Sequence, residues 1–115
     1  MSGKHSRTKG QVGEREARDF FRRWFPDCQR GAAQSRSGGD APDVTGTDFW
    51  VEVKRGAKPN VRAALAQALR DGMHADMPSL VYIRDDFEAP FFVLPEETMK
   101  WLLNKIYPAY DLGTT

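Results

Sequence analysis

The chain has 115 residues, of which 40% are hydrophobic, a size and composition that suit one compact domain and exclude two. Its net charge of +1 conceals an asymmetry, because residues 1–75 carry 14 Lys or Arg against 9 Asp or Glu, whereas residues 76–115 carry 3 against 7. The basic first part suits a polyanionic partner, although a solvated helix face would by itself explain the charges that fall on helices.

Cysteine and apolar content limit the compartment and the kind of site. Cys28 is the only cysteine, which excludes an internal disulfide and favours a reducing compartment. One cysteine and two histidines are too few for a structural zinc site. No apolar run reaches the length of a membrane-spanning helix, and no apolar signal core is present. We therefore expect a cytoplasmic protein with no membrane partner.

The chain opens with a polar, basic stretch over residues 1–8, which predicts a flexible tail. Apolar side chains spaced at i, i+3, i+4, i+7 and i+8 then predict a helix from about Lys9 to Phe25, ended by Pro26. Glu14 lies about 60° from the centre of that apolar stripe and is predicted to face the domain. Glu16 lies about 100° away, and complementing the helix dipole explains it adequately.

A short strand is expected within residues 27–33, followed by a small polar loop over residues 34–41. That loop could hold a phosphate through its backbone N–H groups and Arg36. Glycine–serine loops usually only connect strands, and its position just before Asp43 is what favours a functional role.

Residues 42–54 read as a β-hairpin, with a turn at Gly46-Thr47. The second strand alternates, so Glu52 and Lys54 point to one face of it. The hairpin would also bring Asp43 back beside Glu52. Taken alone, Glu-Val-Lys favours a plain cross-strand ion pair, but the upstream Asp43 and the helical Glu14 favour a site.

The remaining elements complete a sheet covered by helices. We expect a helix over residues 61–74 capped by Asn60, strands over residues 79–84 and 91–94, and a helix over residues 96–106. The order helix, three strands, helix, strand, strand, helix predicts an α/β fold with a mixed central sheet flanked by helices. One domain would span residues 9–107, with a second tail at 108–115.

The chemistry expected of the hairpin is metal-dependent phosphodiester hydrolysis. Asp43, Glu52 and the backbone carbonyl of Val53 supply the oxygen ligands that Mg²⁺ prefers, and Glu14 could add a third carboxylate. Such a metal lowers the pKa of bound water and polarises the phosphate. Lys54 would position that water or stabilise the transition-state charge. We expect Mg²⁺ as the cofactor, with Mn²⁺ as a substitute.

Pro42-Asp43 followed by Glu52-Val53-Lys54 resembles the signature of the PD-(D/E)XK nuclease superfamily, and the element order is similar to that restriction-endonuclease-like fold's αβββαβ core. Residues 9–16 (KGQVGERE) resemble the opening helix of archaeal-type Holliday-junction resolvases and their phage relatives. The similarity covers about residues 9–70. It implies a DNA endonuclease of a bacterial or archaeal cell, or of a phage-infected host.

The resemblance also implies roles for individual residues. Glu14, Asp43 and Glu52 match the family's metal-binding acids, and Lys54 matches its catalytic lysine. Gln67 matches a glutamine in the second helix of many members. Further matches and basic residues nearby give the expected DNA contacts, which are Lys9, Arg15, Ser35 or Ser37, Arg36, Arg55 and Lys58.

The resemblance implies a homodimer that acts on branched DNA, because a four-way junction is nicked twice and symmetrically. The apolar stripe of the last predicted helix could serve that dimer, and a plain core helix is an equal alternative. Three functions follow in order of preference. They are a junction resolvase, a restriction-like or repair nuclease on other DNA forms, and a DNA-binding module without activity.

Overall fold

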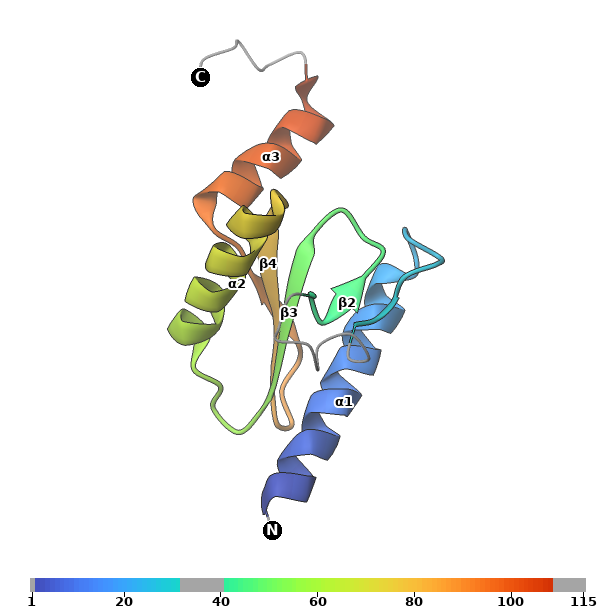
Figure 1. Cartoon of the computed structure of the whole chain (residues 1–115), viewed down its shortest axis with the longest axis vertical. Coiled ribbons are helices and arrows are strands. Elements are labelled where there is room, and N and C mark those ends of the chain that lie inside the picture. Colours follow the sequence, from blue (N-terminus) through green and yellow to red (C-terminus); the bar gives the residue numbers. More distant parts are fainter. Residues whose placement is uncertain (1, 32–40, 109–115) are drawn as a thin grey trace.

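The computed structural model describes the backbone of residues 2–31 and 41–108, and the side chains in those ranges from residue 9 onward (Figure 1). Within these ranges the predicted order of elements is confirmed. The elements are α1 (Ser2–Phe21), β1 (Gln29–Arg30), β2 (Val44–Thr45), β3 (Trp50–Gly56), α2 (Val61–Ala75), β4 (Ser79–Asp85), β5 (Phe91–Val93) and α3 (Glu96–Ile106).

The strands form one mixed sheet in the order β1-β2-β3-β4-β5. β3 and β4 run parallel, because α2 returns the chain between them, and the other neighbours are antiparallel. Val44 pairs with Val51 across the hairpin. This register sets Asp43 beside Glu52, as predicted. The α/β class and the mixed sheet flanked by helices are therefore confirmed.

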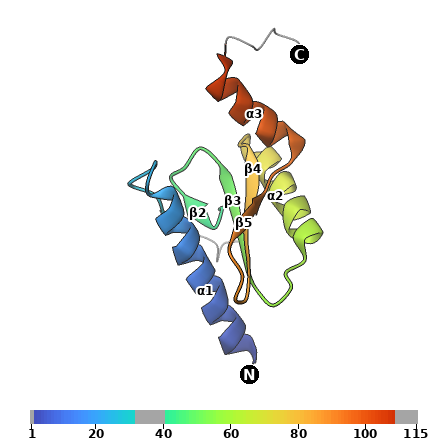
Figure 2. The same ribbon diagram turned by 180° about the vertical axis from the view of Figure 1, so that it is seen from behind.

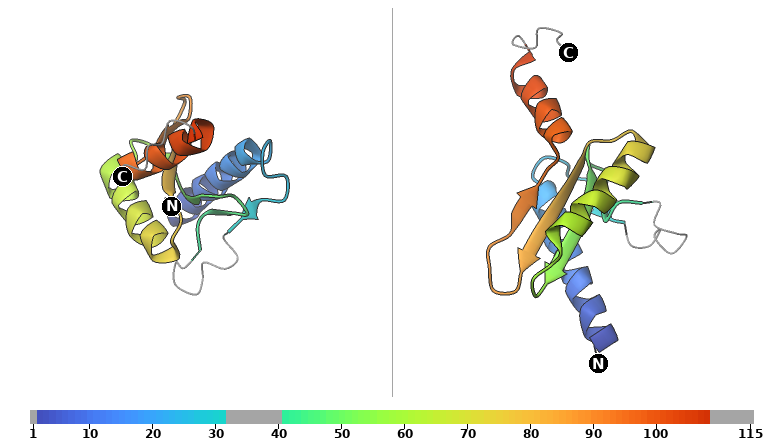
Figure 3. Two further views of the ribbon diagram at one scale, coloured as in Figure 1. Left: turned by 90° about the horizontal axis from the view of Figure 1, so that it is seen from above. Right: turned by 90° about the vertical axis from the view of Figure 1, so that its left-hand side faces the viewer.

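The two faces of the sheet carry separate cores, one under each of the first two helices (Figures 2 and 3). Ala17 and Phe21 of α1 pack on one face, in a cluster that includes Val51 and Val53. The cluster on the other face joins α2 to β4 through Ala64, Ala68, Val81 and Ile83. Neighbouring residues of a strand alternate between the faces, as a pleated strand requires.

The two ends of α1 differ from the prediction. The helix begins at Ser2 rather than Lys9, so the backbone of the predicted tail is helical. Residues 2–8 contain no proline, and extending an existing helix costs far less than starting one. The regular helix ends at Phe21 rather than Phe25, and the chain then tightens into a turn before Pro26. The predicted loop residues Ser35, Arg36 and Ser37 lie outside the described residues.

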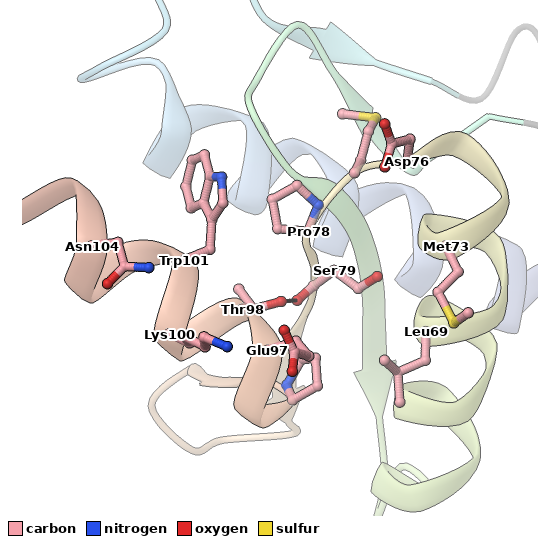
Figure 4. A pocket seen from close by; sticks show the side chains of 12 residues that line it. Leu69, Met73, Asp76, Pro78, Ser79, Glu97, Thr98, Lys100, Trp101 and Asn104 are labelled. Atoms are coloured by element: carbon pink, nitrogen blue, oxygen red, sulfur yellow. Dashed lines mark hydrogen bonds between the residues drawn. The ribbon is translucent and has the colours of Figure 1, made fainter. Parts of the chain in front are cut away.

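α3 stands at one end of the sheet and projects beyond it (Figures 1 and 3). Its buried anchor is Thr98, whose hydroxyl donates to the Ser79 carbonyl at 2.7 Å. Trp101 adds an edge-on contact with Phe49, at 5.4 Å between ring centroids. A cavity of about 720 Å³ lies between this helix and the end of α2 (Figure 4).

Candidate active site

Backbone hydrogen bonds on both sides fix the position of Asp43. Its N–H donates to the carbonyl of Val51 at 2.8 Å, and its carbonyl accepts from Gly31 N–H at 2.9 Å. Its carboxylate Oδ2 accepts from the backbone N–H of Val53 at 2.8 Å. The carboxylate is therefore held against the neighbouring strand rather than free in solvent.

Two glycines allow the neighbouring segments of the chain to lie this close to Asp43. A Cβ on Gly31 would strike the backbone carbonyl oxygen of Pro42, so only glycine fits beside this strand. Gly46 has a φ of +85°, a left-handed conformation that glycine adopts without strain. Together they set the approach of β1 to β2 and the turn that brings β2 back along β3.

Glu52 and Lys54 share a face of β3, as the alternation predicts. The parallel register pairs Glu52 with Val81 and Lys54 with Ile83, and both partners belong to the core beneath α2. Glu52 is only 6% exposed, which is unusual for a carboxylate. Lys54 is half-buried beside it.

Burial and nearby negative charge disfavour the ionised forms of Asp43 and Glu52. Burial raises the pKa of Asp43 to about 6, although the Val53 N–H opposes the rise, and the charge of Glu14 adds to it. Burial, followed by the charge of Asp43, raises the pKa of Glu52 to about 7. Lys54 lowers the pKa of both carboxyls. The two carboxylates thus repel each other in a poorly solvated place, with one ammonium as partial compensation.

Glu14 reaches the same region from α1, as predicted. A Cβ on the preceding Gly13 would lie 2.9 Å from Cβ of Arg55 and 3.2 Å from Val53 Cγ1, so glycine lets α1 approach β3 closely. Glu14 accepts from Arg30 Nη2 at 3.1 Å and raises the pKa of Asp43 by its charge. Arg30 is a member of the site that the sequence reasoning missed.

α2 contributes a second missed residue. Asp71 raises the pKa of Glu52 by its charge, so this part of α2 faces the hairpin. At about 100° per residue, Asp71 lies about 60° from the buried line through Ala68, on the side away from Leu65. The predicted Gln67 precedes Asp71 by one turn and shares that flank. The i, i+4 spacing was a signal that could have identified Asp71.

Trp50 is the third missed residue. Its side chain precedes Glu52 by two positions on β3, and its indole N–H lowers the pKa of Glu52. That Nε1 atom is buried and falls short of hydrogen-bond geometry with any partner among the described residues. A buried N–H that makes no hydrogen bond is uncommon in folded proteins, and this one lies beside a carboxylate. It therefore supports a site that is completed by further polar groups.

The predicted DNA contacts fall into two groups. Lys9 Nζ lies 2.7 Å from Asp86, while Arg55 lies 3.5 Å from Glu16 and 3.7 Å from Asp86, so both cations already have internal partners. Arg15 and Lys58 are exposed on α1 and on the turn after β3.

This ion-pair network also corrects the interpretation of Glu16. The residue is mid-helix, because α1 begins at Ser2, and it does not serve the helix dipole. Its carboxylate accepts from Arg84 at 3.1 Å and approaches Arg55 at 3.5 Å. Glu16 therefore ties α1 to β3 and β4, on the face opposite Glu52.

Asp43 and Glu52 are the two carboxylates of the site that could hold a metal ion. Among residues 9–31 and 41–108, no three His, Cys, Asp or Glu side chains gather closely enough to form a ligating group. Asp43 and Glu52 nevertheless fit a hard divalent cation, because both supply carboxylate oxygens and their mutual repulsion would be relieved by positive charge. Ligation by Glu14 and by the Val53 carbonyl stays a prediction.

Comparison of the chain with protein-family models, with curated proteins and with solved structures gives no match. In the part of the chain that the structure covers, none of the helices is long and apolar enough to cross a membrane.

Proposed function

We propose that this protein is a Mg²⁺-dependent DNA endonuclease with a restriction-endonuclease-like core, and that branched DNA is its substrate. The observation that carries the proposal is the placement of Asp43 beside Glu52 across one hairpin, with Lys54 next to them. Glu52 is buried, Asp43 is half-buried, and both have raised pKa values. A structural ion pair would need one acid, not two that repel each other.

Each side chain would have a distinct task. Asp43 and Glu52 would hold Mg²⁺ or Mn²⁺, which when bound supplies a water of lowered pKa and polarises the phosphate. The Val53 N–H keeps the Asp43 carboxylate oriented. The Lys54 ammonium would offset negative charge at the reacting phosphate. Its positive charge lowers the pKa of both Asp43 and Glu52, which supports this role.

Glu14 and Arg30 would form an outer support for this pair. The two side chains are bonded at 3.1 Å, so Glu14 is oriented by Arg30 on one side and approaches Asp43 on the other. Removing a group that orients a metal-binding side chain commonly lowers activity by about 10- to 100-fold. We expect Arg30→Ala to lower the cleavage rate by a factor on that order.

The preference for a four-way junction rests on the resemblance of residues 9–16 to junction resolvases. The exposed cations Arg15 and Lys58 support binding to the DNA backbone, which positions a protein without reading sequence. No base-reading module is recognisable in the chain. A substrate defined by shape is therefore favoured over one defined by sequence.

The test is cleavage of a labelled four-way junction, duplex, flap and single strand in Mg²⁺, each compared with Asp43→Asn. Paired symmetric nicks in the junction alone are the expected result. Cleavage of linear duplex would instead support the restriction-like or repair nuclease. Binding without cleavage of any of the four would leave a DNA-binding module and refute the enzymatic proposal.

A further inference from the structure

Trp50 is a buried tryptophan that belongs to neither apolar core. It is only 4% exposed, whereas the other buried apolar residues of the described chain all belong to the clusters beneath α1 and α2. Trp24 and Trp101 each pack on another aromatic ring, and Trp50 contacts no aromatic ring within the described ranges. Apolar packing alone therefore does not explain why a tryptophan is buried at this position.

The strand places the Trp50 indole beside the Glu52 carboxylate. The two residues are two positions apart on β3, so their side chains share the face beneath α2 and their Cα atoms are about 7 Å apart. The Trp50 N–H also lowers the pKa of Glu52, an effect that acts only when a donor lies close to the carboxylate. Trp50 therefore directs the one polar atom of its side chain at a residue of the candidate active site.

The N–H of Trp50 and the carboxylate of Glu52 both lack a well-formed hydrogen bond. Trp50 Nε1 is buried, and no acceptor among the described residues lies in hydrogen-bond geometry with it. Asp43 differs from Glu52, because the backbone N–H of Val53 holds the Asp43 carboxylate at 2.8 Å. In the described part of the chain no backbone N–H holds Glu52 in this way. A buried donor without an acceptor is costly, and a rotation of the Glu52 carboxylate would pair the two groups.

We propose that Trp50 is a positioning residue for Glu52, with its indole N–H donated to one carboxylate oxygen while the other oxygen stays free to bind the metal ion. A carboxylate has two acceptor oxygens, so both interactions are possible at once. Hydrogen-bonded partners of this kind commonly orient metal-binding side chains. The inference rests on the proposed metal-dependent function, and it names the group that orients the second acid of the hairpin, as Val53 orients the first.

Asp71 is the competing acceptor for the Trp50 N–H. A Cβ on Gly72 would strike the hydroxyl oxygen of Ser79, and Ser79 pairs with Trp50, so α2 lies close to the sheet at the level of Trp50. The neighbouring Asp71 faces the hairpin from this turn of α2 and raises the pKa of Glu52. Glu52 is buried and Asp71 only half-buried, so Glu52 is the carboxylate that gains more from a donor in place of water.

The first test follows the indole N–H signals of the full chain by proton–nitrogen NMR while Mg²⁺ is added in the absence of DNA. The chain has three tryptophans, and Trp50→Phe identifies the signal of Trp50. That signal should move downfield as Mg²⁺ binds, because a hydrogen bond deshields the proton, while the signals of Trp24 and Trp101 stay in place. Asp71→Asn should keep this shift. Asp43→Asn should lose it at Mg²⁺ concentrations that saturate the wild type.

The second test measures Mg²⁺ affinity by isothermal titration calorimetry in a variant that lacks only the N–H. Replacement of Trp50 by 3-benzothienylalanine puts a sulfur atom in place of the N–H and keeps the size and shape of the ring, and circular dichroism establishes that the variant is folded. Mg²⁺ should bind it about 10- to 100-fold more weakly than the wild type. Trp24→Phe is the matched control, because it removes the indole N–H of a residue that is 60% exposed, and it should bind Mg²⁺ like the wild type.

Several outcomes would overturn the role of Trp50. They are a Trp50 signal that stays in place while Mg²⁺ binds, unchanged Mg²⁺ affinity in the variant without the N–H, and loss of the shift in an Asp71→Asn variant that still binds Mg²⁺. Failure of the wild type to bind Mg²⁺ would refute this role and the proposed function together. Weaker Mg²⁺ binding without the N–H, combined with no cleavage of any DNA by the wild type, would refute the nuclease alone and leave the role of Trp50 standing.

Discussion

The raised pKa values of Asp43 and Glu52 predict that the metal-free protein loses stability as the pH rises. Both carboxyls have a higher pKa in the native state than in the unfolded chain. Well below pH 3.8, the ordinary pKa of Asp43, both are protonated in either state and contribute nothing. Between about pH 4 and pH 7 the native state binds more protons than the unfolded state, so the free energy of unfolding falls as the pH rises.

The magnitude follows from the shifts themselves. Raising the pKa of Asp43 from 3.8 to about 6 corresponds to about 3 kcal/mol of lost stability, at roughly 1.4 kcal/mol for each pH unit. The rise of Glu52 from 4.5 to about 7 is of similar size, on the order of 3 kcal/mol. Part of the Glu52 rise is caused by Asp43, so the two losses overlap and do not add in full.

Asp43→Asn isolates this effect, because the amide oxygen still accepts from the Val53 N–H while the charge is gone. At pH 8 without metal the variant should be more stable than the wild type by about 2–3 kcal/mol, which is about 10 °C in melting temperature for a domain of this size. At pH 4, close to the ordinary pKa of an aspartate, most of the difference should be lost. Asp48→Asn, at an exposed position of the same hairpin, should change little at either pH.

Urea unfolding at pH 4, 6 and 8 measures these differences, since common effects of pH cancel between variant and wild type. A variant no more stable than the wild type at pH 8 would refute the account of two strained carboxylates. A gain that is equal at pH 4 and pH 8 would refute it as well, because the gain would then not come from ionisation.

Three further outcomes are expected. Mg²⁺ at pH 8 should raise the melting temperature of the wild type by several degrees and leave Asp43→Asn unchanged, as measured by differential scanning fluorimetry. Gly31→Ala should lower the free energy of unfolding in urea by at least about 2 kcal/mol, because the added Cβ would strike a backbone carbonyl. Gly10 lies in open space on α1, so Gly10→Ala should raise the free energy of unfolding by about 0.5–1 kcal/mol. Lys58→Ala should weaken DNA binding and reduce the salt dependence of that binding, without a change in melting temperature. Arg55→Ala should instead lower the melting temperature, because it breaks the ion pairs with Glu16 and Asp86.

The hairpin could be predicted from the sequence because its signals are local. Strand alternation fixes the common face of Glu52 and Lys54, and the glycine turn fixes the return of Asp43. The second helix was predictable for the same reason, since Asn60 caps it by accepting from the Ala63 N–H at 3.0 Å. Short-range periodicity and capping carry this information without any knowledge of tertiary packing.

What the sequence left open depends on which elements pack together. The network around Glu16, Arg55 and Asp86 joins three elements distant in the chain, and only the close packing of α1 on β3 brings them together. Arg30 and Asp71 were missed for the same reason. The exposure of Met99, Leu103 and Ile106 on α3 also lay beyond the helical pattern, which is identical for a core helix and for a helix with an exposed apolar side.

The measurement that tests the central claim most directly is the rate of four-way-junction cleavage in Mg²⁺ by the wild type, Asp43→Asn and Asp48→Asn, with junction affinity measured in parallel without metal. The account predicts that Asp43→Asn loses about a hundredfold or more of the cleavage rate while it binds the junction at least as tightly, and that Asp48→Asn keeps both properties. Equal cleavage by Asp43→Asn and the wild type would contradict the assignment of the hairpin as the catalytic site.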